Sequence, residues 1–236
     1  MKTPSYLWNP PPVYSLAVRG LTARYPVHRI FCVGRNYHAH AVEMGAPVDK
    51  SKAQPFYFTK SASSLVESGA TVPYPTGTSN YHYEMELVVA IGAPAFRVKA
   101  AEAASLIYGY AAGLDMTRRD LQLVAREQGR PWDLGKDFEL SAVCSEIVPA
   151  GSLGVLDHGA IKLAVNGKER QSADLSQLIW SIPELLADLS KFYHLLPGDL
   201  IYTGTPEGVG AVKSGDLISG NIDRVGEVSL AIGQPE

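Results

Sequence analysis

Short apolar runs, separated by stretches rich in glycine and proline, form the main pattern along this chain. Runs of this length are typical of β-strands. We therefore expect strands near residues 27–33, 56–59, 84–91, 108–115, 200–202 and 228–232. The dipeptide Asn166-Gly167 follows the apolar run 161–165 and predicts a type I′ hairpin turn, because both residues tolerate positive φ angles.

Helical periodicity is less frequent. Amphipathic patterns predict helices over residues 100–107, 117–128 and 183–192, and Pro183 fits the first helical position of the last one. A shorter helix is expected from Tyr37 to Met44, where Gly45 ends it.

Glu84 and Glu86 interrupt the apolar run 82–91. Side chains alternate between the two faces of a strand, so these glutamates share one face, roughly 7 Å apart along the chain. Two carboxylates on a half-buried face repel each other unless a cation, a proton or hydrogen-bond donors compensate them. A hard divalent cation would meet that need, and a solvated face of an edge strand is the alternative interpretation.

Asp115 strengthens the interpretation as a metal site. It follows residues 108–114, whose small and aromatic residues predict another buried strand. Three acidic side chains from two strands leave positions open for water or substrate, which suits Mg²⁺ or Mn²⁺. Softer metals are disfavoured, because the only cysteines, Cys32 and Cys144, lie far apart and no histidine-rich tract accompanies them.

His40 and Glu43 are three residues apart in the predicted helix after Tyr37. This spacing places them on one face, within hydrogen-bonding reach. A carboxylate on one imidazole nitrogen raises the basicity of the other, as a general base that activates water requires. An ordinary exposed helix pair is the alternative. His38 and His82 have no comparable partner and are interpreted as structural or rim residues.

Composition limits the possible functions. The 236 residues are 46% hydrophobic, which suffices for the core of one domain. No composition shift or repeat marks a second domain, so we expect an N-terminal arm over residues 1–25 and a single domain over residues 26–236. The net charge of −3, without blocks of like charge, argues against nucleic acid as a partner. No stretch has the length of a membrane span, and a cytoplasmic location is expected.

Four motifs occur in an order and spacing that are specific in combination. They are Val33-Gly34-Arg35-Asn36-Tyr37 with His40 and Glu43, His82-Tyr83-Glu84-Met85-Glu86, Gly113-Leu114-Asp115-Met116-Thr117, and Thr203-Gly204-Thr205-Pro206-Glu207-Gly208-Val209-Gly210. With them, the chain resembles the fumarylacetoacetate hydrolase family from about Val27 onward. Within that family it is most similar to the short acylpyruvate hydrolases, and among those to the bacterial fumarylpyruvate hydrolases, which often share a proline-rich start such as Asn9-Pro10-Pro11-Pro12.

The resemblance implies an α+β, strand-rich fold, with a mixed β-roll or barrel-like core of the fumarylacetoacetase C-terminal-domain type and a few peripheral helices. Proteins of this family are usually dimeric, so a homodimer is expected. The resemblance also implies a metal, Mg²⁺ or Mn²⁺, held by Glu84, Glu86 and Asp115. A His40–Glu43 dyad would activate water, and Lys136 would lie near the reacting carbon. Two residues depart from the family pattern, Tyr83 where a histidine is common and Glu139 where an aspartate often stands, and neither removes a ligand.

The implied reaction is hydrolysis of a carbon–carbon bond in an acylpyruvate, with fumarylpyruvate and water giving fumarate and pyruvate in aromatic catabolism. A small-molecule 2-oxo acid suits this site, because its carboxylate and keto oxygens chelate a divalent ion. Lys136 would then stabilise developing negative charge, although a lysine beside a turn is also an ordinary surface residue.

Substrate carboxylates require cationic or backbone donors. The candidates are Arg35, Arg118, Arg119 and the turn Thr203-Gly204-Thr205-Pro206. We favour the turn, because small residues let main-chain amides approach an anion and threonine hydroxyls add donors. A plain strand-end turn is the alternative. The resemblance implies that residues 117–128, with Arg119 and Gln122, border the substrate pocket.

Other functions fit the same residues. An oxaloacetate decarboxylase or a 2-hydroxydienoate isomerase or hydratase would use the same metal site. The His40–Glu43 pair favours a hydrolase over an isomerase, because it can activate water. A non-catalytic protein with a structural metal belongs to a different class, and the presence of acid, base and lysine positions argues against it.

Overall fold

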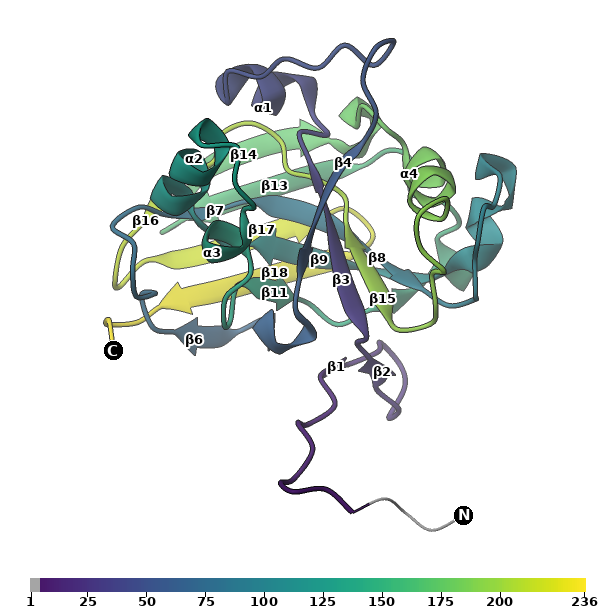
Figure 1. The fold of residues 1–236 in the computed structure, drawn as a ribbon, viewed down its shortest axis with the longest axis horizontal. Coiled ribbons are helices and arrows are strands. Elements are labelled where there is room, and N and C mark those ends of the chain that lie inside the picture. Colours follow the sequence, from purple (N-terminus) through teal and green to yellow (C-terminus); the bar gives the residue numbers. More distant parts are fainter. Residues whose placement is uncertain (1–4) are drawn as a thin grey trace.

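Two large β-sheets form the body of the protein, which we describe from a computed structural model over residues 5–236 (Figure 1). The larger sheet has the strand order β4-β3-β15-β8-β9-β11-β5, and β12 also pairs with β9. Its strands are β3 (Arg29–Gly34), β4 (Phe56–Lys60), β5 (Leu65–Glu67), β8 (Met85–Ile91), β9 (Ile107–Asp115), β11 (Ala142–Cys144), β12 (Val148–Pro149) and β15 (Asp199–Tyr202).

The second sheet has the order β14-β13-β17-β18-β6. It contains β6 (Ala70–Val72), β13 (Ala160–Val165), β14 (Lys168–Asp174), β17 (Leu217–Ile222) and β18 (Gly226–Ile232). A small sheet joins β7 (Tyr81–Tyr83) to β10 (Thr117–Arg118) and β16 (Gly210–Val212), and β1 (Ser15–Leu16) pairs with β2 (Tyr25–Pro26). The strand-rich α+β class and the predicted strands are thus confirmed.

The predicted hairpin is also present. β13 and β14 pair antiparallel on either side of Asn166 and Gly167, whose φ angles are +52° and +75°. Both angles are positive, as a type I′ turn requires.

The helices are short and lie at the periphery of the sheets (Figure 1). They are α1 (His38–Glu43), α2 (Arg119–Glu127), α3 (Asp133–Lys136) and α4 (Ile182–Leu189). Pro183 occupies the second helical position rather than the first, because α4 begins at Ile182. Within the predicted helix 100–107, residues 100–106 form a 3₁₀-helix, η2 (Ala100–Leu106), instead of an α-helix, and Ile107 begins β9. A seven-residue segment that leads directly into β9 makes few α-helical hydrogen bonds, so the 3₁₀ form can compete. The other 3₁₀ segments are η1 (Ala62–Ser64), η3 (Ala150–Ser152) and η4 (Leu175–Gln177).

Strand β8 is buried on both faces, and its two faces enter different cores. Leu87 and Val89 pack into the larger apolar cluster, whereas Val88 and Ala90 pack into a second cluster. Glu86 shares the face of Val88 and Ala90, since its position is even. That face is therefore apolar at one end of the strand and acidic at the other.

The N-terminal segment has two parts. Leu16, Val18 and Tyr25 are buried in the second cluster, whereas residues 5–12 are exposed and extend away from the body (Figure 1). The first four residues of the predicted arm lie outside the described residues. The division into an arm and one domain remains a prediction.

Candidate active site

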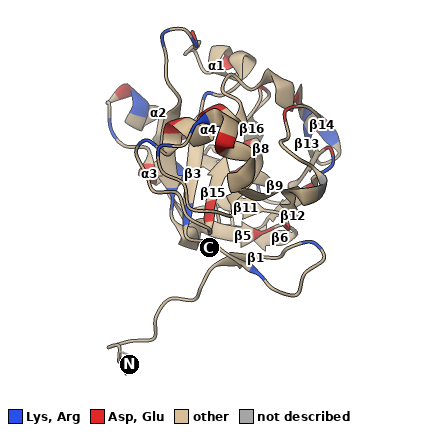
Figure 2. Cartoon of the chain, turned by 90° about the vertical axis from the view of Figure 1, so that its right-hand side faces the viewer, with Lys and Arg blue, Asp and Glu red and all other residues tan. Residues whose placement is uncertain are grey.

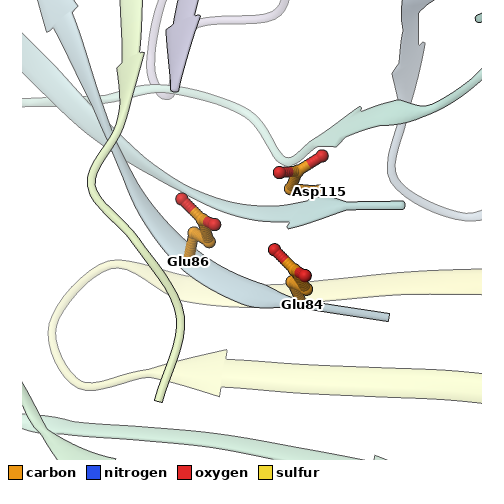
Figure 3. Close-up of side chains that lie close together, drawn as sticks. All are labelled: Glu84, Glu86 and Asp115. Atoms are coloured by element: carbon orange, nitrogen blue, oxygen red, sulfur yellow. The ribbon is translucent and has the colours of Figure 1, made fainter. Parts of the chain in front are cut away.

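Three carboxylates meet at the acidic end of β8. Glu84, Glu86 and Asp115 each offer an oxygen, and these oxygens lie within 4.8 Å of one another (Figure 3). Glu84 is 5% exposed, Glu86 is 1% exposed and Asp115 is 0% exposed. A solvated edge face, the alternative interpretation of the glutamate pair, is therefore wrong.

Pairing of β8 with β9 brings the carboxylates together. Asp115 is the last residue of β9, and its amide donates to the carbonyl of Glu84, which lies between β7 and β8, at 2.9 Å. Gly113 stands opposite Glu86 in the register. A Cβ at Gly113 would lie 2.5 Å from Val88 and 2.7 Å from Tyr202, so only glycine allows this close packing beside the site.

Cations surround two of the three carboxylates. Lys136 Nζ donates to Glu84 Oε2 at 2.8 Å, to Asp115 Oδ2 at 2.7 Å and to Thr117 Oγ1 at 2.8 Å. Arg119 pairs with the other oxygen of Glu84. Burial opposes ionisation of Glu84, but Lys136 and Arg119 outweigh it and hold the pKa of this carboxyl well below its usual range.

Glu86 lacks such a partner. Its Oε2 accepts a hydrogen bond from the Gly204 amide at 2.7 Å, and no cation pairs with it in the part of the chain that the structure describes. Burial, reinforced by the negative charges of Asp115 and Glu84, raises the pKa of Glu86 well above its usual value. An additional positive charge beside Glu86 would favour its ionised form.

The donor set fits a hard divalent cation. Asp115 Oδ1 is buried and accepts no hydrogen bond from the described residues. This oxygen, with Glu86 and Glu84, supplies the acidic oxygen ligands that Mg²⁺ and Mn²⁺ prefer. Two carboxylates from the β7–β8 segment and one from β9 would hold such an ion.

Lys60, on β4, is a site residue that sequence reasoning missed. Its Nζ donates hydrogen bonds to Met116 O, Lys136 O and Ser141 Oγ. The same Nζ lies 2.9 Å from Asp115 Oδ1, so its positive charge compensates this oxygen although the oxygen accepts no hydrogen bond. Lys60 is the last residue of an otherwise half-exposed strand, and no local pattern distinguishes it from a surface lysine.

His40 and Glu43 lie in contact, as their spacing predicts. His40 Nδ1 and Glu43 Oε2 are 3.1 Å apart, and Glu43 Oε1 accepts from the Gly208 amide at 3.1 Å. His40 is 5% exposed, whereas Glu43 is exposed, so the imidazole itself does not belong to an ordinary exposed helix pair. If Nδ1 donates to Glu43, Nε2 is left with a free lone pair.

One cavity contains many of the predicted site residues. The predicted residues that line it are Arg35, His40, Glu84, Glu86, Arg119, Gln122, Lys136 and Thr205.

Arg119 is held from three sides. Besides Glu84, it donates to Gln122 Oε1, and its Nε lies 3.4 Å from His82 Nδ1. His82 Nε2 in turn lies 2.8 Å from Asn80 Oδ1. His82 thus contacts an amide and a guanidinium rather than a carboxylate, which is compatible with its interpretation as a structural or rim residue. The Gln122 amide nitrogen keeps its two protons for a ligand, because its oxygen serves Arg119.

The Thr203–Pro206 turn differs from the expectation in one respect. The Gly204 amide approaches an anion, but that anion is Glu86. The Thr203 hydroxyl donates to Leu87 O at 2.9 Å, and its residue is fully buried. Only Thr205 lines the cavity, where its hydroxyl accepts from Gln171 at 2.9 Å. The turn thus positions a carboxylate, and substrate binding by Thr203 and Gly204 is left without structural support.

Arg118 lines another hollow, where its guanidinium covers the Phe138 ring, 4.1 Å from the ring centroid.

Among residues 5–236, no helix is long and apolar enough to span a membrane.

Comparisons with known proteins identify relatives of this chain. The family model described as fumarylacetoacetate (FAA) hydrolase C-terminal matches residues 29–232. A fumarylpyruvate hydrolase from Ralstonia sp. is 65% identical over 193 residues, which cover 82% of this chain and all of that protein. A mitochondrial oxaloacetate tautomerase from Arabidopsis thaliana is 39% identical over 204 residues, 86% of this chain and 90% of that one.

A solved structure shares the whole architecture. The crystal structure of fumarylpyruvate hydrolase from Pseudomonas aeruginosa, in complex with Mn²⁺ and pyruvate, superposes with a TM-score of 0.93 at 47% identity. The match covers 98% of this chain and all of the other. The fold that the family resemblance implies, with a mixed β-roll or barrel-like core, is confirmed.

Proposed function

The chain belongs to the fumarylacetoacetate hydrolase family, and we propose that it is a metal-dependent hydrolase that converts fumarylpyruvate and water into fumarate and pyruvate. The observation that carries the proposal is a single cavity that joins His40 to the buried acidic cluster. The 65% identity to the Ralstonia fumarylpyruvate hydrolase supports the choice of substrate.

The acidic residues provide the binding end of the site. Glu84, Glu86 and Asp115 would hold Mg²⁺ or Mn²⁺, and when bound the ion would polarise the keto oxygen of a 2-oxo acid and stabilise the enolate of pyruvate. Arg119 and the Gln122 amide lie beside these carboxylates and can orient the carboxylate of the 2-oxo acid.

His40 provides the base. Its Nε2 accepts a proton from water, the resulting hydroxide adds to the distal keto carbon, and Glu43 stabilises the imidazolium through Nδ1. When the carbon–carbon bond breaks, its electron pair moves to the pyruvate fragment. A proton then returns to that carbon, and the other fragment leaves as fumarate. Lys136 pairs with both Glu84 and Asp115 and so compensates their negative charges.

Oxaloacetate tautomerisation is a second candidate, because the Arabidopsis relative is an oxaloacetate tautomerase. That reaction needs only proton transfer on a bound 2-oxo acid. The contact between buried His40 and Glu43 favours the hydrolase, since activation of water is what a carboxylate-oriented imidazole adds.

We propose further that the protein forms a homodimer in the cytoplasm. The exposed N-terminal residues Tyr6, Leu7 and Trp8 are 64%, 93% and 76% accessible, and burial against a second copy would remove this apolar surface from water. Light scattering before and after deletion of residues 1–12 tests the dimer, because a monomeric wild-type protein would contradict it.

The first test is a spectrophotometric assay with fumarylpyruvate and added Mg²⁺ or Mn²⁺. Loss of the enol absorbance with stoichiometric pyruvate and fumarate, abolished by a chelator, supports the hydrolase. Turnover of oxaloacetate tautomers without cleavage of fumarylpyruvate would favour the second candidate. A chelator that lowers the melting temperature of a protein with no turnover would indicate a structural metal.

Glu86→Gln and Glu169→Gln form a matched pair for this assay. Glu86→Gln removes a ligand oxygen from the cluster and should abolish both Mn²⁺ binding and turnover. Glu169 is exposed on β14, away from the cavity, so its variant should retain both. Full activity of Glu86→Gln would overturn the metal assignment.

A further inference from the structure

The cavity continues from the acidic cluster to a cationic mouth. Arg35, Arg126 and Trp132 line the same cavity as Glu84 and Glu86. All three also line an adjacent open hollow, which shares Phe58 and Lys136 with the cavity. An extended molecule bound at the carboxylates can therefore reach these arginines without leaving the cavity.

The charges differ between the two ends. At the inner end, Lys60, Lys136 and Arg119 are each paired with a carboxylate. At the mouth, Arg35 and Arg126 form no ion pair with any residue in the range 5–236. Arg126 donates one hydrogen bond to the carbonyl of Met44, at 2.9 Å. This hydrogen bond holds the Arg126 side chain beside α1. Two cations without anionic partners thus face one opening.

Arg35 is held in a conformation that suits few residues. Its φ angle is +59°, in the left-handed region where a non-glycine residue is uncommon. Its guanidinium lies 5.5 Å from the centroid of the Phe56 ring. Stacking on an aromatic ring orients the planar guanidinium and leaves its in-plane donors available to a carboxylate.

Aromatic side chains line both the cavity and the adjacent hollow. Phe58 and Trp132 line the cavity and lie against each other, with ring centroids 5.9 Å apart. Flat apolar surfaces suit a conjugated carbon chain rather than a branched or heavily hydrated one. Figure 2 shows both basic and acidic segments on α2.

We propose that Arg35 and Arg126 bind a second carboxylate at the far end of the substrate and so select dicarboxylic over monocarboxylic acylpyruvates. This inference rests on the proposed function for the identity of the substrate. The residues at the cavity mouth would then determine which acyl group binds. The acidic cluster handles the 2-oxo acid end, which all acylpyruvates share.

A binding experiment tests the inference without requiring turnover. The probes are 2-oxoheptanedioate and 2-oxoheptanoate, which share the 2-oxo acid end and chain length and differ only in the distal carboxylate. Neither has the 4-keto group that hydrolysis needs. Calorimetry on the Mn²⁺-loaded protein should show the diacid binding roughly 10- to 100-fold more tightly, the effect of a charge-assisted hydrogen bond.

Arg35→Gln and Arg126→Gln should each reduce this preference at least about fivefold. Arg35→Gly removes the same charge but suits the positive φ angle, so it separates loss of the cation from backbone strain. Arg130→Gln is the control, because Arg130 lines only the outer hollow. A wild-type protein without preference, or variants that retain it, would overturn the inference.

The fumarylpyruvate assay distinguishes this failure from failure of the proposed function. Loss of the preference in the arginine variants, together with fumarylpyruvate hydrolysis by the wild type, supports both the inference and the proposed function. Hydrolysis without any preference for the diacid contradicts only the role of the arginines. Preference without hydrolysis contradicts only the proposed reaction.

Discussion

Lys60 and Asp115 form an ion pair that is fully buried, with Nζ 2.9 Å from Oδ1. Lys136 reaches the other oxygen of the same carboxylate, at 2.7 Å. The two lysines come from β4 and from the end of α3, so Asp115 is fixed between elements that are distant in sequence. Since burying a lone carboxylate is strongly unfavourable, this arrangement makes an acidic cluster possible inside the protein.

Lys60→Met should lower the free energy of unfolding by about 3 to 5 kcal/mol, because it leaves Asp115 without one of its buried partners. Urea unfolding followed by fluorescence measures the change. Lys52→Met is the control, since the Lys52 side chain is 83% exposed and its ion pair contributes little. Equal urea midpoints for Lys60→Met and the wild type would show that the buried pair adds no stability.

His40→Ala should reduce kcat for fumarylpyruvate by roughly two to four orders of magnitude, because no other group replaces the base. Mn²⁺ affinity, measured by calorimetry, should change little, since His40 pairs with Glu43 and donates nothing to the carboxylate cluster. His38→Ala is the matched control, because His38 is exposed on the same helix. Unchanged turnover in His40→Ala would exclude it as the base.

Stability should depend on pH through His82. Burial, and then the neighbouring Arg119, lower the pKa of His82 from 6.5 to about 4. Between these two values the unfolded chain binds a proton that the folded chain does not. The free energy of unfolding therefore falls as the pH drops from about 6.5 toward 4.

His82→Gln should make this pH dependence weaker. Urea midpoints at pH 7, 5.5 and 4.5 measure it for the variant, the wild type and the control His38→Gln. The control should follow the wild type. If His82→Gln shows the same pH dependence as the wild type, the histidine titrates normally in the folded protein.

Gly167→Ala should destabilise the protein by about 1 to 2 kcal/mol, because alanine must adopt the positive φ angle of the β13–β14 turn. Space is not the cause, since a Cβ at Gly167 meets nothing within 4 Å. Gly151 has equal space without a positive φ angle, so Gly151→Ala is the control and should be nearly neutral. Similar melting temperatures for the two variants would contradict this explanation.

The amino-acid sequence determined the features that depend on short stretches of chain. Apolar runs specified β8 and β9, because alternation and burial act within one strand. Asn166-Gly167 specified the hairpin, because backbone conformation at a turn is set by its own residues. The pairing of Glu84 with Glu86 indicated the acidic cluster, because buried carboxylates of like charge need a compensating cation.

Tertiary structure decided how the charges are balanced. No local sequence pattern marks Lys60 or Arg126 as a site residue. Lys60 lies beside Asp115 and Arg126 lies at the cavity mouth only because β4 and α2 pack around the cavity. The Gly204 amide likewise meets Glu86 across 118 positions of sequence. Such contacts depend on how distant elements pack, because a hydrogen bond or an ion pair acts over a few ångströms in space regardless of sequence separation.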